Sequence, residues 1–287
     1  MIRWTPQGVV AYPRAVQIRL NLNHPQRIPG NAPTPTRTMT VDEFDDNLHY
    51  FTTGLDGPRS RPCTSLILSG LTEDYVTLIV NRIEQFKSLG FIKLILHLDH
   101  QYVEPTQNIK SHADFQIKRV CSVKSIENLM ALTKQTATDI DLSIMLNHDN
   151  LSHWEELIAQ LRIWKGALVS FHYPYPSQTP PSNHTVEHIR ASLKQCQKQC
   201  PHLRIHVKGL PLCYLAPLKF PFRQTGNRWY VDSDHQKDNA LLFLPNVLQF
   251  HKVDACRFCP LDGQCDGFFL EHLNRGHYPP LCPPNPA

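Results

Sequence analysis

The stretch LILSGLTEDYVTLIVNRIEQFKSLGFIKLILHL, residues 66–98, decides the fold class. It contains an apolar run of strand length, then apolar residues at helical spacing, then a second apolar run. Thr72 is the candidate N-cap of the helix and Gly90 its stop, because threonine can accept hydrogen bonds from the first turn and glycine tolerates the conformation that ends a helix. The first run, residues 64–70, is nearly uninterrupted, which is typical of a strand covered on both faces.

The same alternation continues along the chain. Strands that alternate with helices of about ten to fifteen residues are typical of parallel βαβ units. Right-handed crossovers then give an open doubly wound sheet or a full or partial barrel, with the working site at the carboxyl ends of the strands. The further predicted strands cover residues 15–23, 115–123, 140–146, 167–173 and 203–209. The further predicted helices cover residues 125–134, 151–164 and 185–200.

This alternation of strands and helices ends near residue 210. Residues 209–236 read as a loop and a short hairpin around Trp229 to Asp232, and a cysteine-containing segment follows. We therefore expect two parts, an α/β domain over residues 1–209 and a small C-terminal extension over residues 210–287.

Composition narrows the class of protein. With 287 residues and 41% apolar residues, the chain can bury a substantial core. Its net charge of +4 comes from 29 basic and 25 acidic residues without a long block of like charge, so composition gives no support for a nucleic-acid partner. The sequence lacks an apolar run of about eighteen residues and a secretory signal at its start, so we expect a soluble cytoplasmic protein without a membrane partner.

The cysteines point to metal chemistry. Nine cysteines in a cytoplasmic chain are not expected to form a disulfide framework, because the cytosol keeps thiols reduced. The stretch DACRFCPLDGQCDGFF, residues 254–269, has C-x2-C-x5-C spacing, which lets two thiolates from one tight turn reach one metal centre. The three cysteines are Cys256, Cys259 and Cys265.

Three soft ligands require a fourth, and two cysteines are candidates. Cys213 lies in GLPLCYL and Cys282 in PPLCPP. We prefer Cys213, because its ligation would close a loop of about forty residues and fix the extension to the main domain. The pattern leaves open an iron–sulfur cluster, ordinary buried thiols, and a tetrahedral zinc with a histidine as fourth ligand. The histidine candidates are His251, His272 and His277.

Other candidate residues carry weaker signals. Cys196 and Cys200 share one face of a predicted helix, and Cys63 and Cys121 lie in or beside predicted strands, so all four read as small buried hydrophobes. Nucleotide-binding and hydrolase motifs are absent from the sequence. Polar residues that follow predicted strands, and could line a site there, are His97, His100, His172 and Tyr173.

Together, the βα body, GLPLCYL and CRFCPLDGQCDGFFLEHLNRG resemble radical SAM proteins that carry a C-terminal SPASM or twitch-type auxiliary cluster segment. The likeness covers about residues 15–276. It implies a partial (β/α)6 TIM-like barrel over residues 1–209 and a SPASM/twitch-like segment over residues 210–287. It also implies one 4Fe–4S cluster, for which we expect as ligands Cys213, Cys256, Cys259 and Cys265, with Cys282 as the alternative fourth.

Two departures from the family bear on catalysis. The family holds its catalytic cluster with C-x3-C-x2-C in the loop after the first strand, but residues 24–38 here contain no cysteine. The family's Gly-Gly-Glu turn is replaced by Ser69-Gly70-Leu71-Thr72. S-adenosylmethionine is therefore not an expected cofactor, and the resemblance implies a catalytically degenerate homologue.

The leading hypothesis is a non-catalytic subunit or binding module in peptide or protein modification. Its partner would be a peptide substrate or an active radical SAM enzyme. One rival is an enzyme that uses the barrel mouth for non-radical chemistry through His97, His100 and His172. Another is an interaction module in which zinc only stabilises the C-terminal fold.

Overall fold

The fold was analysed in a computed structural model of the chain. The residues that it describes are 2–5, 8–11, 13–21, 36–53, 62–107, 109–134, 139–173, 186–215, 218, 220, 226–244 and 250–274. The chain divides into two compact units, one of residues 1–121 and 226–248, the other of residues 122–225 and 249–287. This division does not follow the boundary expected between residues 209 and 210: the expected α/β domain is itself divided between residues 121 and 122, and residues 226–248 belong to the first unit.

The first unit contains a mainly parallel sheet with the strand order β11-β10-β3-β4-β5-β6. Only β11 in this order runs antiparallel, to β10. The predicted hairpin near Trp229 is therefore confirmed, but β10 also pairs in parallel with β3. The strands are β3 (Ala15–Arg19), β4 (Ser65–Ser69), β5 (Lys93–Leu98), β6 (Gln116–Val123), β10 (Arg228–Val231) and β11 (Leu241–Phe243). A separate hairpin joins β1 (Ile2–Thr5) and β2 (Gly8–Ala11).

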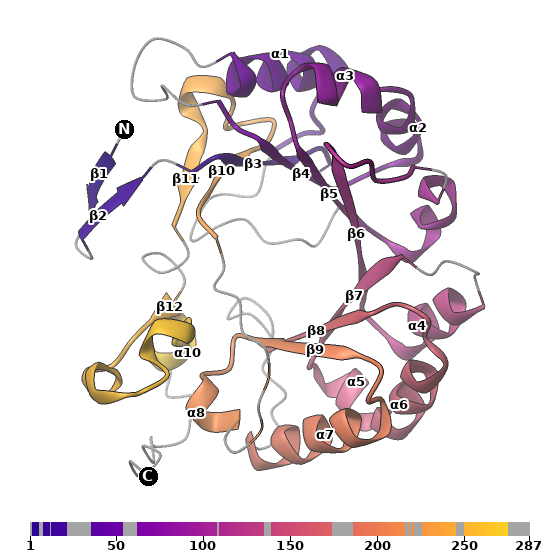
Figure 1. Cartoon of the computed structure of the whole chain (residues 1–287), viewed down its shortest axis with the longest axis vertical. Helices are drawn as coiled ribbons and strands as arrows, with labels where there is room; N and C mark the ends of the chain where they lie inside the picture. Colours follow the sequence, from indigo (N-terminus) through magenta and orange to yellow (C-terminus); the bar gives the residue numbers. More distant parts are fainter. Residues whose placement is uncertain are drawn as a thin grey trace. The chain divides into compact units, whose positions relative to one another are not determined.

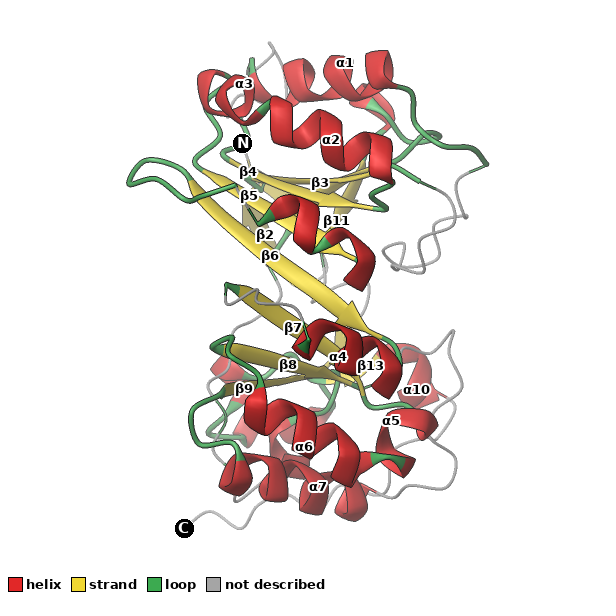
Figure 2. Cartoon of the chain, turned by 90° about the vertical axis from the view of Figure 1, so that its right-hand side faces the viewer, coloured by secondary structure: helices red, strands yellow, loops and turns green. Residues whose placement is uncertain are grey.

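Helices cover one side of this sheet. Figures 1 and 2 show α1, α2 and α3 together on the same side of strands β3 to β5. Thr72 caps α2 as predicted, its side chain accepting from the Tyr75 N–H. The helical elements are α1 (Val41–Thr52), α2 (Glu73–Asn81), α3 (Ile83–Ser88), η1 (His100–Tyr102), η2 (Glu104–Thr106) and η3 (Lys237–Asn239).

Strands β4 and β5 of the first unit each have one buried face and one face that is mostly half-buried. Leu66 and Leu68 of β4 are fully buried, whereas Ser65 and Ile67 are only half-buried. Strand β5 alternates in the same way. The interpretation of β4 as a strand covered on both faces is therefore wrong: the apolar Ile67 conceals an alternating pattern, and the helices cover the leucine face.

The second unit repeats the βα pattern. Strands β7 (Ile140–Met145), β8 (Leu168–His172) and β9 (Arg204–Lys208) pair in parallel. The C-terminal segment adds a short antiparallel pair, β12 (Phe250–His251) and β13 (Phe268–Phe269), followed by α10 (Leu270–Asn274). The other helices are α4 (Ile126–Thr133), α5 (His148–Ser152), α6 (Trp154–Ile163), α7 (Val186–Gln199) and α8 (Leu212–Leu215). The predicted α/β class is confirmed by both units.

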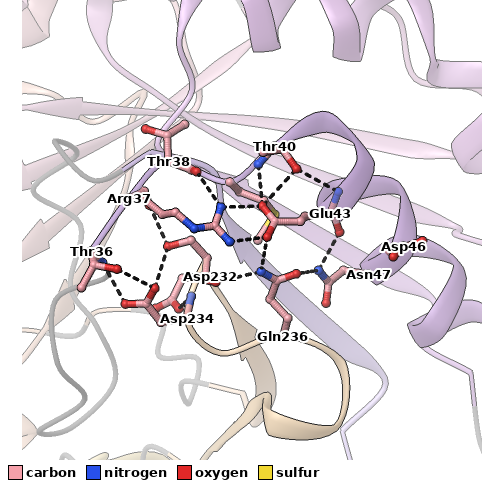
Figure 3. A network of polar contacts seen from close by, with 12 residues as sticks. Thr36, Arg37, Thr38, Thr40, Glu43, Asp46, Asn47, Asp232, Asp234 and Gln236 are labelled. Atoms are coloured by element: carbon pink, nitrogen blue, oxygen red, sulfur yellow. Dashed lines mark hydrogen bonds and ion pairs between the residues drawn. The ribbon is translucent and has the colours of Figure 1, made fainter.

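A polar network in the first unit ties the start of α1 to the turn after β10 (Figure 3). Glu43 and Thr40 form a reciprocal capping box, and the Arg37 guanidinium pairs with both oxygens of the Glu43 carboxylate. Gln236 Nε2 donates to Glu43 Oε1 at 2.9 Å. Thr36 donates to the Asp234 carboxylate through its backbone N–H at 2.8 Å and its hydroxyl at 2.9 Å. Segments about 200 residues apart in sequence are thus held together by charge-assisted hydrogen bonds.

None of the helices in the described part of the chain is both long and apolar enough to span a membrane.

Candidate metal centre

The cysteine segment folds as a chain of tight turns between β12 and β13. The turns include the 3-10 helices η4 (Asp254–Phe258) and η5 (Asp262–Gln264). The Cys259 N–H donates to the Cys256 carbonyl at 3.0 Å, and the Asp262 N–H donates to the Cys259 carbonyl at 3.0 Å. The antiparallel pairing of Phe250 with Phe269 then joins the two ends of the segment. The turns therefore return all three cysteines toward one place.

The backbone conformation two residues after Cys265 requires a glycine, Gly267. Its φ of +93° lies in the region that favours glycine. A Cβ at this position would lie 2.5 Å from the His251 carbonyl oxygen of β12. The glycine in Cys265-Asp266-Gly267 thus permits the close approach of β12 to the chain that leaves Cys265.

All four expected ligands line one cavity in the second unit. The cavity is bounded by Cys213, Cys256, Cys259 and Cys265, and by other residues of the same segments, including Lys252 and Asp262. Cys213 belongs to α8, just after β9, and is far in sequence from the other three. The structure thus brings together the four cysteines that the sequence singled out; their role as ligands stays a prediction.

Backbone amides point at one of the sulfurs. Cys265 Sγ accepts from the Leu212 N–H at 3.4 Å and from the Gly267 N–H at 3.3 Å. Hydrogen bonds of this kind favour the charged thiolate over the neutral thiol, and they adjust the properties of a metal-bound sulfur. Leu212 is the neighbour of Cys213, so the same contact holds the α8 loop against the cysteine segment.

Burial disfavours the thiolate form of three of these cysteines. Burial raises the pKa of Cys213 to about 11, and the neighbouring thiols of Cys265, Cys256 and Cys259 add to this shift. Burial also raises the pKa of Cys256 and of Cys265. A cationic centre would reverse this preference, because thiolates are the ligating form, so metal loading would release protons.

The two histidine candidates that the structure describes, His251 and His272, do not line this cavity. His272 is fully buried, and its ring lies 5.5 Å from the Tyr173 ring and 5.9 Å from the Phe269 ring, both nearly edge to face. His251 is an exposed residue of β12. His277 and Cys282 lie outside the described residues. Among the side chains that the structure does describe, no group of three or more His, Cys, Asp or Glu is arranged to hold a single metal ion.

The cysteine segment packs on the carboxyl ends of β8 and β9. Tyr173 follows β8 and Gly209 follows β9. Gly209 has a φ of +79°, and a Cβ there would lie 2.3 Å from the Phe269 ring. The Phe269 ring also stacks on Phe250 with a centroid distance of 4.9 Å. An aromatic cluster therefore anchors the segment at the strand ends where the sequence predicted a working site.

The remaining described cysteines occupy core positions. Cys63 is 2% exposed, and Cys121, Cys196 and Cys200 are fully buried. Burial raises the pKa of Cys196 well above its ordinary value, so this thiol stays protonated. The interpretation of these four as small hydrophobes agrees with their burial.

The turn after β4 contains Gly70 and Leu71. Gly70 has a φ of +70°, and a Cβ there would lie 2.8 Å from the Asn21 backbone nitrogen. Leu71 is buried. The turn therefore combines a glycine that permits close backbone approach with a buried leucine. Most of the cysteine-free loop after β3, residues 22–35, lies outside the described residues.

The histidines proposed for a different enzymatic site fall in separate units. His97 lies on β5 and His100 in η1, both in the first unit. His172 ends β8 in the second unit. Each is half-buried. Within each unit these residues lie at or after the carboxyl end of a parallel strand, as the sequence predicted.

Sequence reasoning missed Lys252 as a residue of the cavity. Its ammonium lies 2.9 Å from Asp262 Oδ1 and 2.5 Å from the Asp262 carbonyl oxygen, which ties β12 to η5. The positions of a lysine and an aspartate ten residues apart carry no signal of their own. Only the turns between them bring the two side chains together.

Comparison with known proteins leaves the family open. No family model matches this chain, and no curated protein matches it significantly.

Proposed function

We propose that this chain is a radical SAM-like iron–sulfur protein that carries one auxiliary 4Fe–4S cluster on Cys213, Cys256, Cys259 and Cys265. The observation that supports the proposal is the convergence of these four thiols on one cavity. One thiol comes from the loop after β9, so the group spans two distant segments. An all-cysteine set of this kind suits an iron–sulfur cluster or a structural zinc.

Hydrogen bonding supports the cluster. The two backbone N–H groups on Cys265 Sγ provide the outer contacts that tune thiolate ligands. The cluster would supply an electron-transfer or structural centre. The chain's own contribution is to fix the four sulfurs, and to link the C-terminal segment to the α8 loop through Leu212.

The proposal includes a partial (β/α)6 barrel that no longer cleaves S-adenosylmethionine. The βα order of the two units is compatible with such a barrel. Residues 24–38 contain no cysteine, and Leu71 occupies the turn where the family has a carboxylate. A cluster that cleaves the sulfonium needs three closely spaced thiolates in that loop. The role that fits these features is a non-catalytic subunit or binding module in peptide or protein modification.

Anaerobic purification tests the proposal directly. The protein should be brown, with broad absorption near 400 nm, and should contain about four irons and four sulfides per chain. Reduction in the presence of S-adenosylmethionine should give no 5′-deoxyadenosine. A colourless protein with about one zinc would support the zinc-stabilised module instead, and cleavage of S-adenosylmethionine would refute the non-catalytic role.

A matched variant controls for general damage to the segment. Phe258 lies between two expected ligands and is 91% exposed. Phe258→Ser should leave the iron content and the absorption unchanged, because the side chain contributes neither a ligand nor core packing. Loss of iron in this variant would mean that metal content responds to any substitution in the segment, and not specifically to removal of a cysteine sulfur.

A further inference from the structure

A lysine and an aspartate line the candidate metal centre together with the four cysteines. Among the described residues around the cavity, Lys252 is the only cation and Asp262 the only carboxylate. Both side chains are partly exposed, and they form an ion pair. Asp266 is a further carboxylate of the same segment, but it is buried and is not among the residues that line the cavity. The cavity therefore has one pair of opposite charges beside its thiols.

Backbone packing holds the lysine beside one of the sulfurs. Lys252 directly follows β12, which ends at His251. Gly267 lies against this point, because a Cβ on it would be 2.5 Å from the His251 carbonyl oxygen and 3.2 Å from Lys252 Cγ. The Gly267 N–H in turn donates to Cys265 Sγ at 3.3 Å. The lysine stem therefore passes next to the backbone group that binds this sulfur.

The aspartate fixes the charged end of the lysine. The Lys252 ammonium lies 2.9 Å from Asp262 Oδ1 and 2.5 Å from the Asp262 carbonyl oxygen. Asp262 begins η5, which lies in sequence between Cys259 and Cys265, and its N–H donates to the Cys259 carbonyl at 3.0 Å. The ion pair thus holds the ammonium against the turn that connects these two cysteines.

The two charges act on thiolates in opposite directions. Four thiolates around a divalent ion or a 4Fe–4S cluster give a centre with net negative charge. A nearby cation stabilises such a centre, and a nearby carboxylate destabilises it. The thiols show the same opposition. Burial raises the pKa of Cys265, and the charge of Lys252 opposes this shift. Burial also raises the pKa of Cys256, and the charge of Asp262 adds to the shift.

We propose that Lys252 compensates the negative charge of the thiolate centre, and that Asp262 is a positioning residue that holds the lysine and limits its effect. This role rests on the proposed function, because it takes the four cysteines as ligands. A purely structural tie between β12 and η5 would be broken alike by loss of either partner. Charge compensation instead requires that loss of Lys252 and loss of Asp262 have opposite effects on the centre.

Titration of the reduced, metal-free full chain with Co²⁺ tests this role, because thiolate-bound cobalt absorbs visible light. Lys252→Gln removes the charge but keeps most of the stem, and it should weaken cobalt binding roughly tenfold. Asp262→Asn should strengthen cobalt binding by a similar factor, because the ammonium then lacks its counter-charge. Lys252→Arg keeps the charge and should bind cobalt like the wild-type protein. Weaker binding in both Lys252→Gln and Asp262→Asn would overturn the proposal in favour of a structural tie.

Arg257→Gln is the matched control for the lost charge. Arg257 is the neighbour of Cys256 in sequence, but its side chain is 78% exposed and is not among those that line the cavity. It pairs at 3.4 Å with Asp254, which is also exposed. Its substitution removes the same charge and should change the cobalt affinity less than about twofold. Equal losses in Arg257→Gln and Lys252→Gln would mean that the overall charge of the segment acts, and not Lys252.

Potentiometric titration of the iron-loaded protein gives a second measurement. Lys252→Gln should shift the equilibrium between the oxidised and reduced cluster roughly tenfold toward the oxidised form, or about 59 mV for one electron. Asp262→Asn should shift it toward the reduced form.

The two measurements separate this role from the proposed function. A protein without iron whose cobalt affinity responds to the two charges as predicted would refute the cluster and retain the role of Lys252. A protein with the cluster whose potential and cobalt affinity ignore both substitutions would refute the role of Lys252 alone. A protein that takes up neither iron nor cobalt would refute both proposals.

Discussion

Glu43 has the most heavily bonded carboxylate of the described polar network. The Arg37 guanidinium holds the pKa of Glu43 well below its ordinary value, and hydrogen bonds from Thr40 and Gln236 act in the same direction. The carboxylate therefore joins three elements, namely the approach to α1, the first turn of α1 and the turn after β10. None of these links can be seen in the sequence except the capping box, because the partners are up to 193 residues apart.

Removal of the Glu43 charge should destabilise the first unit. Glu43→Gln should lower the free energy of unfolding by about 1–2 kcal/mol, as for the loss of a strong helix cap. Because its pKa is lowered in the folded state, the carboxylate stabilises the fold above its unfolded pKa of about 4.3 and loses this effect as the pH falls. In denaturant titrations between about pH 3 and pH 6, the free energy of unfolding of the variant should therefore decrease less with falling pH than that of the wild-type protein.

Glu84→Gln is the control for this measurement. Glu84 is 78% exposed and pairs with Lys87 on the surface of α3. Its substitution should change the free energy of unfolding by less than about 0.5 kcal/mol. Similar losses in both variants would mean that Glu43 acts as an ordinary surface charge.

At the scale of elements, the sequence predicted the βα order because most strands and helices carry their own apolar period. The sequence did not predict α1, because the charged residues of this helix interrupt the apolar pattern that marks a buried helix face. The Thr40–Glu43 capping box was the signal that could have found it. It also missed the parallel pairing of β10 with β3, since a short strand after a long loop does not reveal its partner.

The docking of the C-terminal segment can be tested at Gly209. Gly209→Ala places a methyl group against the Phe269 ring and also imposes a positive φ on alanine. Gly90 is a matched control, with a φ of +89° and open space around its Cβ position. Gly90→Ala should lower the free energy of unfolding by about 1 kcal/mol through backbone strain alone. Gly209→Ala should lower it by about 1–3 kcal/mol more, because the added methyl group overpacks the site.

Denaturant unfolding measures both costs, and a double variant identifies their cause. In the Phe269→Ala background, Gly209→Ala should lower the free energy of unfolding by less than it does in the wild-type protein, because the ring that the new methyl group meets is absent. Equal costs at Gly209 and Gly90 would show that Phe269 does not pack on the end of β9.

At the scale of the whole molecule, the two units should respond differently to the metal. The expected ligands all belong to the second unit. Chelation should speed hydrogen exchange in residues 211–215 and 250–269, because metal ligation stabilises the turns that carry the thiols. Exchange in β3, β4 and β5 should stay unchanged. Faster exchange throughout both units would show that the metal supports the global fold.

The part of the candidate site that is local in sequence could be predicted, and the part that depends on distant segments was harder to predict. The C-x2-C-x5-C spacing is local, so a single stretch of sequence reveals three thiols that share a turn. The position of Cys213 required a long-range argument from loop closure, and the structure places that residue at the same cavity.

The account depends on four particular sulfurs holding one cluster, and iron analysis of single variants tests this most directly. Serine is substituted in turn at Cys213, Cys256, Cys259, Cys265 and Cys282, and each protein is reconstituted anaerobically. We predict loss of most iron and of the absorption near 400 nm for the first four variants, with the Cys282→Ser protein retaining the wild-type content. Full iron content in Cys213→Ser, with loss in Cys282→Ser, would contradict the account.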